Sequence, residues 1–303
     1  MATQQTLILK LGALGDVLRT AALLHALDGQ VTWVTSAKAA PLLADNPFIH
    51  RLYAIERLDH GPPRERFDQV INLEDEPAAA RLASELNARE RVGTFWDGDA
   101  IAYSESSREW FDMSLSSRFD KLEADRQKMA NRKAYQELIF AMLGKRFEGQ
   151  EYVLKAPADL SAVRGLVGLE SRAGDAWPMK QWNQFSALVR ELEAAGFTVT
   201  SFEQRPTLEQ YIADIERCEY VVCGDTLAMH IALALKKQIV AIFTCTAPQE
   251  IYDYGRLTKV VSPLWTKYFY GREYNSEAAD AIPLSRVLNA VLARAGKIPT
   301  EVN

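Results

Sequence analysis

Two aspartates in this 303-residue chain stand where a strand is expected to end and a helix to begin. Asp16 follows an apolar run and a turn marked by Gly12 and Gly15, and Asp225 follows another apolar run and Gly224. Ligands of open α/β proteins bind at the carboxyl ends of strands, so both aspartates are candidate site residues. Such a carboxylate can take a proton from an attacking hydroxyl, or it can cap the helix. For Asp16, the residues alone leave both interpretations open.

Polar residues near and beyond Asp225 suit a bound phosphate. Thr226 opens the expected helix, where unpaired backbone N–H groups favour an anion. His230 lies about one turn further on, and its alternative is a packed histidine that a carbonyl satisfies. Thr246 follows the next expected strand, where its hydroxyl could hold phosphate or cap a helix near Gln249. The recurrence of such residues at successive strand ends fits a bound nucleotide.

Two series of alternating strands and helices are expected to position these residues. Strands are expected at residues 7–9, 31–34, 67–73 and 91–95, and again at 165–169, 198–202, 220–223 and 239–243. The alternation predicts an α/β fold with parallel sheets, in two domains that span residues 1–155 and 156–303. A single helix is expected over 126–143, and the stretch 96–118, which lacks a clear period, is expected to be a functional loop.

Composition and missing motifs exclude several function classes. A formal charge of −5 argues against a general nucleic-acid binder, because phosphate contacts need a basic face. The three cysteines and four histidines have no metal-ligand spacing, so no metal is expected. There is no P-loop, H-E-x-x-H pair or complete dinucleotide fingerprint. With neither a signal peptide nor an apolar run of about 20 residues, a cytoplasmic protein is expected.

Six motifs, in order along the chain, resemble those of glycosyltransferase family 9, the ADP-heptose:lipopolysaccharide heptosyltransferase family. Residues 9–20 resemble its K-x-x-x-x-G-D-x-L-x-T opening, 67–73 its Y-D-x-x-I-D-L strand, and 91–93 its R-I-G strand. Residues 177–182 resemble W-P-x-x-x-W, 225–230 resemble D-T-x-x-x-H, and 243–255 resemble F-G-P-T-x-P with Y-G. The resemblance implies the GT-B fold, in which two Rossmann-like domains with parallel sheets face each other across a cleft. It also implies that the last helix packs back toward the N-terminal domain.

The resemblance further implies an activity and a role for each domain. A sugar, expected to be a heptose, would move with inversion from an ADP-sugar to a saccharide acceptor such as lipopolysaccharide core or a related glycan. No metal or other cofactor would take part, and any contact with the inner membrane would be peripheral and through the acceptor. The N-terminal domain would bind this acceptor, with Asp16 as general base and, beside it, Lys10, Gly12, Gly15 and Arg19. The C-terminal domain would bind the nucleotide sugar through Asp225, Thr226, His230, Thr246, Arg172 and Lys180.

One departure from the family pattern concerns the diphosphate. Many family members carry a basic residue just before W-P, whereas this chain has Asp175 and Ala176 there. Arg172 or Lys180 is therefore expected to supply the charge. One alternative function is a catalytically decayed nucleotide-sugar-binding protein of the same fold. Another is an epimerase acting on a nucleotide sugar, which would use Asp16 or Glu74 as its crevice carboxylate.

Overall fold

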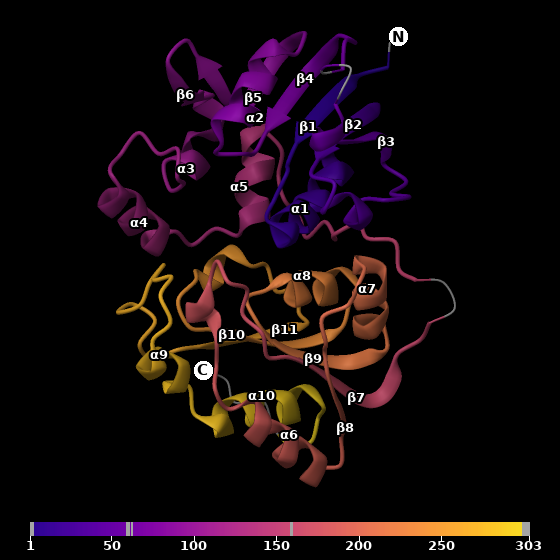
Figure 1. The fold of residues 1–303 in the computed structure, drawn as a ribbon, viewed down its shortest axis with the longest axis vertical. Helices are drawn as coiled ribbons and strands as arrows, with labels where there is room; N and C mark the ends of the chain where they lie inside the picture. The colour runs from indigo at the N-terminus through magenta and orange to yellow at the C-terminus, as the bar shows by residue number, and fades with distance from the viewer. Residues whose placement is uncertain (1–2, 59–60, 62, 158–159, 299–303) are drawn as a thin grey trace. The chain divides into compact units, whose positions relative to one another are not determined.

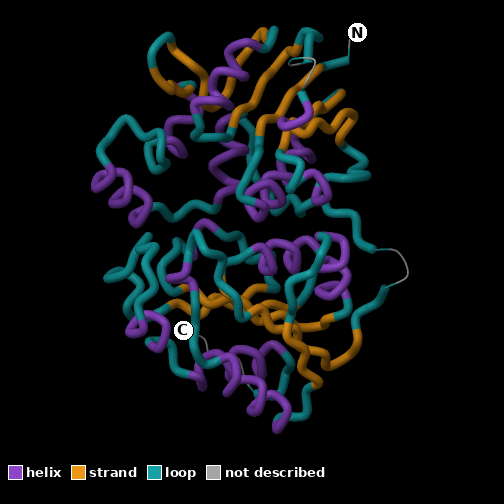
Figure 2. Tube along the Cα trace, viewed as in Figure 1, coloured by secondary structure: helices purple, strands orange, loops and turns teal. Residues whose placement is uncertain are grey.

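The structure is a computed structural model that describes residues 3–58, 61, 63–157 and 160–298. The chain divides into two compact units, Met1–Lys155 and Ala156–Asn303. In each unit a single sheet has helices packed on its two faces (Figures 1 and 2). The predicted α/β class with two parallel-sheet domains is confirmed.

The first unit contains a six-stranded sheet in the order β3-β2-β1-β4-β5-β6. Every neighbouring pair is parallel except β5 and β6. Because β2 and β4 flank β1, the carboxyl ends of β1 and β4 form the point where the strand order reverses, the usual place for a ligand. The strands are β1 (Gln5–Leu9), β2 (Gln30–Thr35), β3 (Ile49–Ala54), β4 (Phe67–Asn72), β5 (Ala88–Asp97) and β6 (Ala100–Tyr103).

Both faces of this sheet are buried, as expected for parallel strands covered by helices. Side chains alternate along β1, so Ile8 packs with Val17 on one face, while Leu7 and Leu9 pack with Ala83 on the other. This alternation fixes the carboxyl end of β1 between two layers of helices. The helices are α1 (Leu14–Thr20), α2 (Pro77–Glu85), α3 (Arg108–Phe111), α4 (Lys121–Ala130) and α5 (Tyr135–Met142).

The second unit contains a five-stranded parallel sheet in the order β11-β10-β9-β7-β8. Its strand order reverses between β7 and β9. Helices α6 and α10 cover one face, and α7 and α8 lie on the other (Figure 1). The elements are β7 (Val163–Glu170), α6 (Phe185–Ala194), β8 (Thr198–Ser201), α7 (Leu208–Glu216), β9 (Cys218–Gly224), α8 (Leu227–Ala234), β10 (Gln238–Phe243), β11 (Leu257–Val261), α9 (Ser276–Asp280) and α10 (Leu284–Arg294).

Two expectations from the sequence need correction. The helix expected over 126–143 is two helices, α4 and α5, because Asn131 folds back onto Lys133 through hydrogen bonds of 2.9 and 2.8 Å. The stretch 96–118 is not one irregular loop, since β6 pairs with β5 across a tight turn in which Gly98 has a φ of 67°. The last helix, α10, buries its apolar face on the second unit's sheet through Val287 and Val291, and its expected packing toward the N-terminal domain stays a prediction.

Among the residues that the structure describes, no helix is both long enough and apolar enough to cross a bilayer.

Candidate functional site

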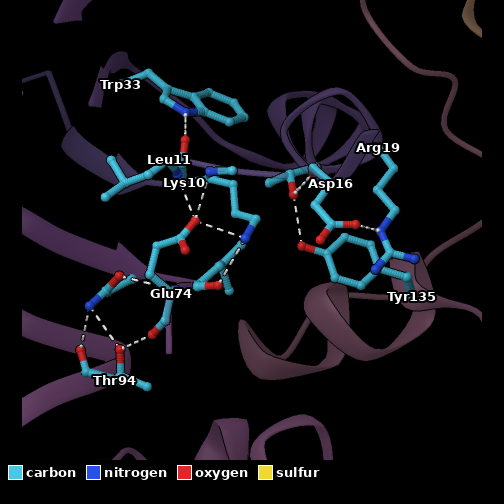
Figure 3. A network of polar contacts seen from close by, with 12 residues as sticks. Lys10, Leu11, Asp16, Arg19, Trp33, Glu74, Thr94 and Tyr135 are labelled. Atoms are coloured by element: carbon cyan, nitrogen blue, oxygen red, sulfur yellow. Dashed lines mark hydrogen bonds and ion pairs between the residues drawn. The ribbon is translucent and has the colours of Figure 1, made fainter. Parts of the chain in front are cut away.

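The carboxyl end of β1 is held by a buried ion pair between Lys10 and Glu74 (Figure 3). Lys10 Nζ donates to Glu74 Oε1 at 2.8 Å, and the same oxygen accepts the backbone N–H groups of Leu11 at 2.6 Å and Gly12 at 3.3 Å. Burial alone would lower the pKa of Lys10, but the charges of Glu74 and Asp16 outweigh it and raise that pKa. Glu74 therefore fixes the glycine turn, and its contacts do not favour the role of a base in an epimerase.

Asp16 lies beyond this turn, in the first turn of α1. The N-cap is Ala13, no side chain caps this helix, and the interpretation of Asp16 as a helix cap is wrong. Its side chain is 37% exposed, and its Oδ1 lies 3.0 Å from Arg19 Nε. Gly15 precedes it inside α1. Asp16 is thus a partly exposed carboxylate beyond a strand end, with one oxygen oriented by a cation and a side chain accessible to a substrate hydroxyl.

The guanidinium of Arg19 stacks on an aromatic side chain that no motif in the sequence indicates. The guanidinium carbon of Arg19 lies 3.9 Å from the ring centroid of Tyr135 in α5 (Figure 3). The Tyr135 hydroxyl is 2.7 Å from Thr20 Oγ1, and Arg19 is buried. Burial raises the pKa of Tyr135, so the phenol stays neutral. No sequence motif marks Tyr135, because only the break between α4 and α5 places it under α1.

In the second unit, Lys180 and Asp225 form an ion pair where β9 gives way to α8. Lys180 Nζ donates to Asp225 Oδ2 at 2.9 Å and to the Asp225 carbonyl oxygen at 2.6 Å. The two side chains are 16% and 15% exposed. Burial opposes ionisation of Asp225, but the charges of Lys180 and His230 outweigh it and hold the pKa of that carboxyl well below its usual range. Of the two predicted replacement cations, Lys180 is the one that contacts Asp225.

The helix after Asp225 offers hydrogen-bonding groups at its start. Thr226 is the N-cap of α8, and its buried hydroxyl has no hydrogen-bond partner among the described residues. His230 lies in α8 and is buried. The N–H groups of a helix's first turn are free to bind an anion, and the helix dipole favours one there. This end of α8 is therefore suited to a phosphate group.

The two other predicted donor residues lie on neighbouring loops. Thr246 is buried after β10 and is not a helix cap, because Ala247 precedes the short helical turn there and no side chain caps it. Arg172 follows β7, and its Nε and Nη2 donate to Glu170 at 2.8 and 2.6 Å. Glu170 also accepts the hydroxyl of Tyr211 at 2.5 Å. Arg172 is thus already paired with a carboxylate, whereas Thr246 lies close enough to Asp225 to favour its charged form.

The segment 263–275 also reaches these strand ends, which sequence reasoning did not foresee. Trp265 Nε1 donates to the Thr246 carbonyl at 2.6 Å, and Tyr270 N donates to the Cys245 carbonyl at 2.9 Å. The ring of Tyr270 meets Trp177 edge-on at 5.5 Å. The density of aromatic residues in this segment was the available signal. Within the described ranges, no group of three or more His, Cys, Asp or Glu side chains could hold a metal ion.

Comparison with known protein families gives a match that covers four of the candidate residues of the second unit. The model of "Glycosyltransferase family 9 (heptosyltransferase)" matches residues 198–270, which include Asp225, Thr226, His230 and Thr246. A search of curated protein sequences gives no match.

Solved structures match the chain over almost its whole length. A glycosyl transferase family 9 protein from Veillonella parvula has a TM-score of 0.66 at 15% identity, with 97% of this chain and 98% of that chain covered. E. coli heptosyltransferase WaaC, solved with ADP, has a TM-score of 0.61 at 16% identity, with 97% and 99% covered. The dodecameric iron-containing glycosyltransferase TibC from enterotoxigenic E. coli has a TM-score of 0.59 at 14% identity, with 97% and 76% covered. At these low identities, the TM-scores show that this chain and the three proteins share a fold.

The motifs along the chain, the family match over 198–270 and the common fold agree with one another. They also bear out the enzyme class expected from the sequence, a glycosyltransferase. The match over residues 198–270 and the shared fold agree with the resemblance to glycosyltransferase family 9 that the sequence motifs indicate.

Proposed function

We propose that this protein is an inverting, metal-independent glycosyltransferase that moves a sugar, expected to be a heptose, from an ADP-sugar to a saccharide acceptor. Lipopolysaccharide core or a related glycan is the expected acceptor class, and the reaction is expected in the cytoplasm. The observation that carries the proposal is the Lys180–Asp225 pair at the start of α8, beside the free hydroxyl of Thr226. An ammonium group and a helix N-terminus together form a site for a diphosphate.

The donor would bind at the strand ends of the second unit. The diphosphate would take the N–H groups at the start of α8, and Lys180 would stabilise the charge that grows on it as the glycosidic bond breaks. Asp225 orients the ammonium group of Lys180 through the bond to Oδ2. His230 and Thr246 would complete the contacts with the ribose and phosphates. ADP is the favoured nucleotide because WaaC, with the same fold, was solved with ADP.

The acceptor would bind at the strand ends of the first unit, with Asp16 as the general base. The Asp16 carboxylate would take the proton of the acceptor hydroxyl while the hydroxyl oxygen attacks the anomeric carbon and the diphosphate leaves from the opposite side. This single displacement inverts the anomeric centre. Arg19 would orient the Asp16 carboxylate, and Lys10 and Gly12 would shape the turn beside the acceptor.

Metal independence rests on what supplies positive charge to the leaving group. Lys180 and the N-terminus of α8 take the place that a divalent cation has in other transferases. One relative, TibC, is named as iron-containing. Addition of a chelator is therefore part of the test.

The second candidate, a decayed nucleotide-sugar-binding protein, is favoured by one observation. Arg172 is paired with Glu170, and Lys180 is paired with Asp225, so both predicted cations are already compensated by carboxylates. The two candidates differ in turnover, not in fold.

The test is release of ADP from ADP-heptose with a panel of glycan acceptors in excess chelator. The proposal expects acceptor-dependent ADP release that survives chelation and falls about 10²–10⁴-fold in Asp16→Asn. Asp28→Asn, which removes an exposed carboxylate from the same unit, is the control and should retain full rate. Binding of ADP-heptose without turnover on any acceptor would favour the decayed protein. Loss of rate in chelator that a divalent ion restores would contradict the metal-free mechanism.

A further inference from the structure

Arg272 is the exposed guanidinium of the segment 263–275, and it rests on a tryptophan ring. Its guanidinium carbon lies 4.5 Å from the ring centroid of Trp177. Lys180 Nζ lies 5.3 Å from the same centroid. The indole ring therefore brings together two cations that are 92 residues apart in the sequence. Trp is the aromatic side chain that holds a cation best.

Arg272 differs from the other cations around the start of α8 in having no carboxylate partner among the described residues. The loops at these strand ends, residues 170–182, 224–230, 244–250 and 262–275, contribute four Lys or Arg side chains. Three of them contact carboxylates: Arg172 pairs with Glu170, Lys180 with Asp225, and Lys267 with Glu277. Arg272 makes no ion pair with any described residue, and its contact is the Trp177 ring.

A diphosphate needs more positive charge than a compensated pair supplies. The charge of Lys180 is largely cancelled by Asp225, whose pKa is held well below its usual range so that it stays ionised. Asp175 and Ala176, just before Trp177, add no positive charge there. A guanidinium with no carboxylate partner, in contact with the same ring as Lys180, would supply the missing charge, and its planar fork can bind two phosphate oxygens at once.

The segment that carries Arg272 is anchored beside the site rather than hanging free. Hydrogen bonds from Trp265 and Tyr270 tie it to the turn after β10 at Thr246 and Cys245. Tyr270 packs edge-on against Trp177 at 5.5 Å. The backbone on both sides of Arg272 is therefore held, since Asn275 caps α9 a few residues later. A side chain fixed in this way loses less entropy when it binds a ligand.

From these contacts we infer that Arg272 is a second diphosphate-binding residue for the donor, held in place by Trp177. The inference rests on the proposed function, because it takes a nucleoside diphosphate as the ligand. On this inference, the positive charge that no carboxylate compensates comes from Arg272, in a loop outside the six motifs.

The test is calorimetric titration of the full chain with ADP at low and high salt. Arg272→Gln should weaken ADP binding about tenfold at low salt, equivalent to about 1.4 kcal/mol. The deficit should shrink at high salt, because salt screens an exposed charge. Arg272→Lys should recover part of the affinity. Lys267→Gln removes a cation of the same segment that Glu277 already compensates, so this control should bind ADP like the wild type.

Two results would overturn the inference while leaving the proposed function in place. One is wild-type ADP affinity in Arg272→Gln when Lys180→Met binds ADP poorly. The other is an equal loss in Arg272→Gln at all salt concentrations, which would indicate altered packing of the segment and not a lost charge. If the wild type itself binds no ADP, the proposed donor site and this inference both fail.

Discussion

Arg19 Nε lies 3.0 Å from Asp16 Oδ1, while the guanidinium carbon of Arg19 lies 3.9 Å from the ring centroid of Tyr135. The carboxylate is 37% exposed, but the cation that orients it is 8% exposed. A buried guanidinium that stacks on a fixed ring has little freedom, so it can hold an exposed carboxylate in one orientation. The geometry of Asp16 therefore depends on α5.

Substitution of Tyr135 tests this dependence. Tyr135→Phe keeps the ring under Arg19 and loses the contact with Thr20, so we expect it to lower the free energy of unfolding by about 1 kcal/mol and to leave transfer nearly intact. Tyr135→Leu also removes the ring and should lower kcat several-fold further, with ADP affinity unchanged. Urea unfolding, steady-state transfer and ADP titration measure the three quantities. Equal kcat in the two variants would show that the ring does not position Arg19.

The buried Lys10–Glu74 pair gives a second prediction. Glu74→Leu leaves the Lys10 ammonium buried without its partner, so the free energy of unfolding should fall by about 3–5 kcal/mol. The double variant Lys10→Met with Glu74→Leu should recover much of that loss, because no uncompensated charge remains. The backbone N–H groups of Leu11 and Gly12 still lose their acceptor, so recovery should be partial. Denaturant unfolding of the three proteins checks this. A double variant no more stable than Glu74→Leu would contradict it.

The Lys180–Asp225 pair links folding to ligand binding. Lys180→Met should weaken ADP binding at least tenfold, because a charge-assisted hydrogen bond is worth about 1.5–3 kcal/mol. It should also lower the free energy of unfolding, since Asp225 is left buried without its cation. Arg172→Met serves as the matched control, because Arg172 contacts Glu170 and not Asp225. An equal loss of ADP affinity in Arg172→Met and Lys180→Met would contradict the proposal that Lys180, and not Arg172, binds the diphosphate.

The depressed pKa of Asp225 predicts a pH dependence of stability. Burial opposes its ionisation, but Lys180 and His230 prevail, so the folded pKa lies below the unfolded value of about 3.9. The stabilisation is then fully present above the unfolded pKa and is lost as pH falls through the folded pKa. The difference in unfolding free energy between the wild type and Asp225→Asn should be constant from about pH 6 to 5 and should shrink toward pH 3. Urea unfolding at each pH measures this difference. A difference that grows on acidification would show that the folded pKa of Asp225 is raised and not lowered.

Sequence reasoning was successful where the signal is local. Period-two burial in β1 and the strand-to-helix turns at Asp16 and Asp225 depend on neighbouring residues, so the sheets and both strand ends could be placed from the sequence. The break between α4 and α5 was missed because Asn131 is compatible with a helix until its side chain bonds to Lys133. The apolar face of α10 lies on the second unit's sheet through Val287 and Val291, and its expected packing toward the N-terminal domain stays a prediction.

The supporting residues of the candidate site could not be predicted in this way. Tyr135 and Arg272 act on residues 116 and 95 positions away, and no spacing rule connects them. The choice between Arg172 and Lys180 was also left open by the sequence. In the structure the carboxylate of Glu170 pairs with Arg172 through two hydrogen bonds, and the role of either cation toward a diphosphate stays a prediction.

Calorimetric titration of the full chain with ADP, UDP and GDP, in chelator and at fixed salt, tests whether the second unit binds the nucleotide of an ADP-sugar. We expect ADP to bind in the presence of chelator, UDP and GDP to bind at least tenfold more weakly, and Lys180→Met to remove most of the ADP signal. Absence of binding for all three nucleotides, or ADP binding that Lys180→Met leaves unchanged, would contradict this expectation.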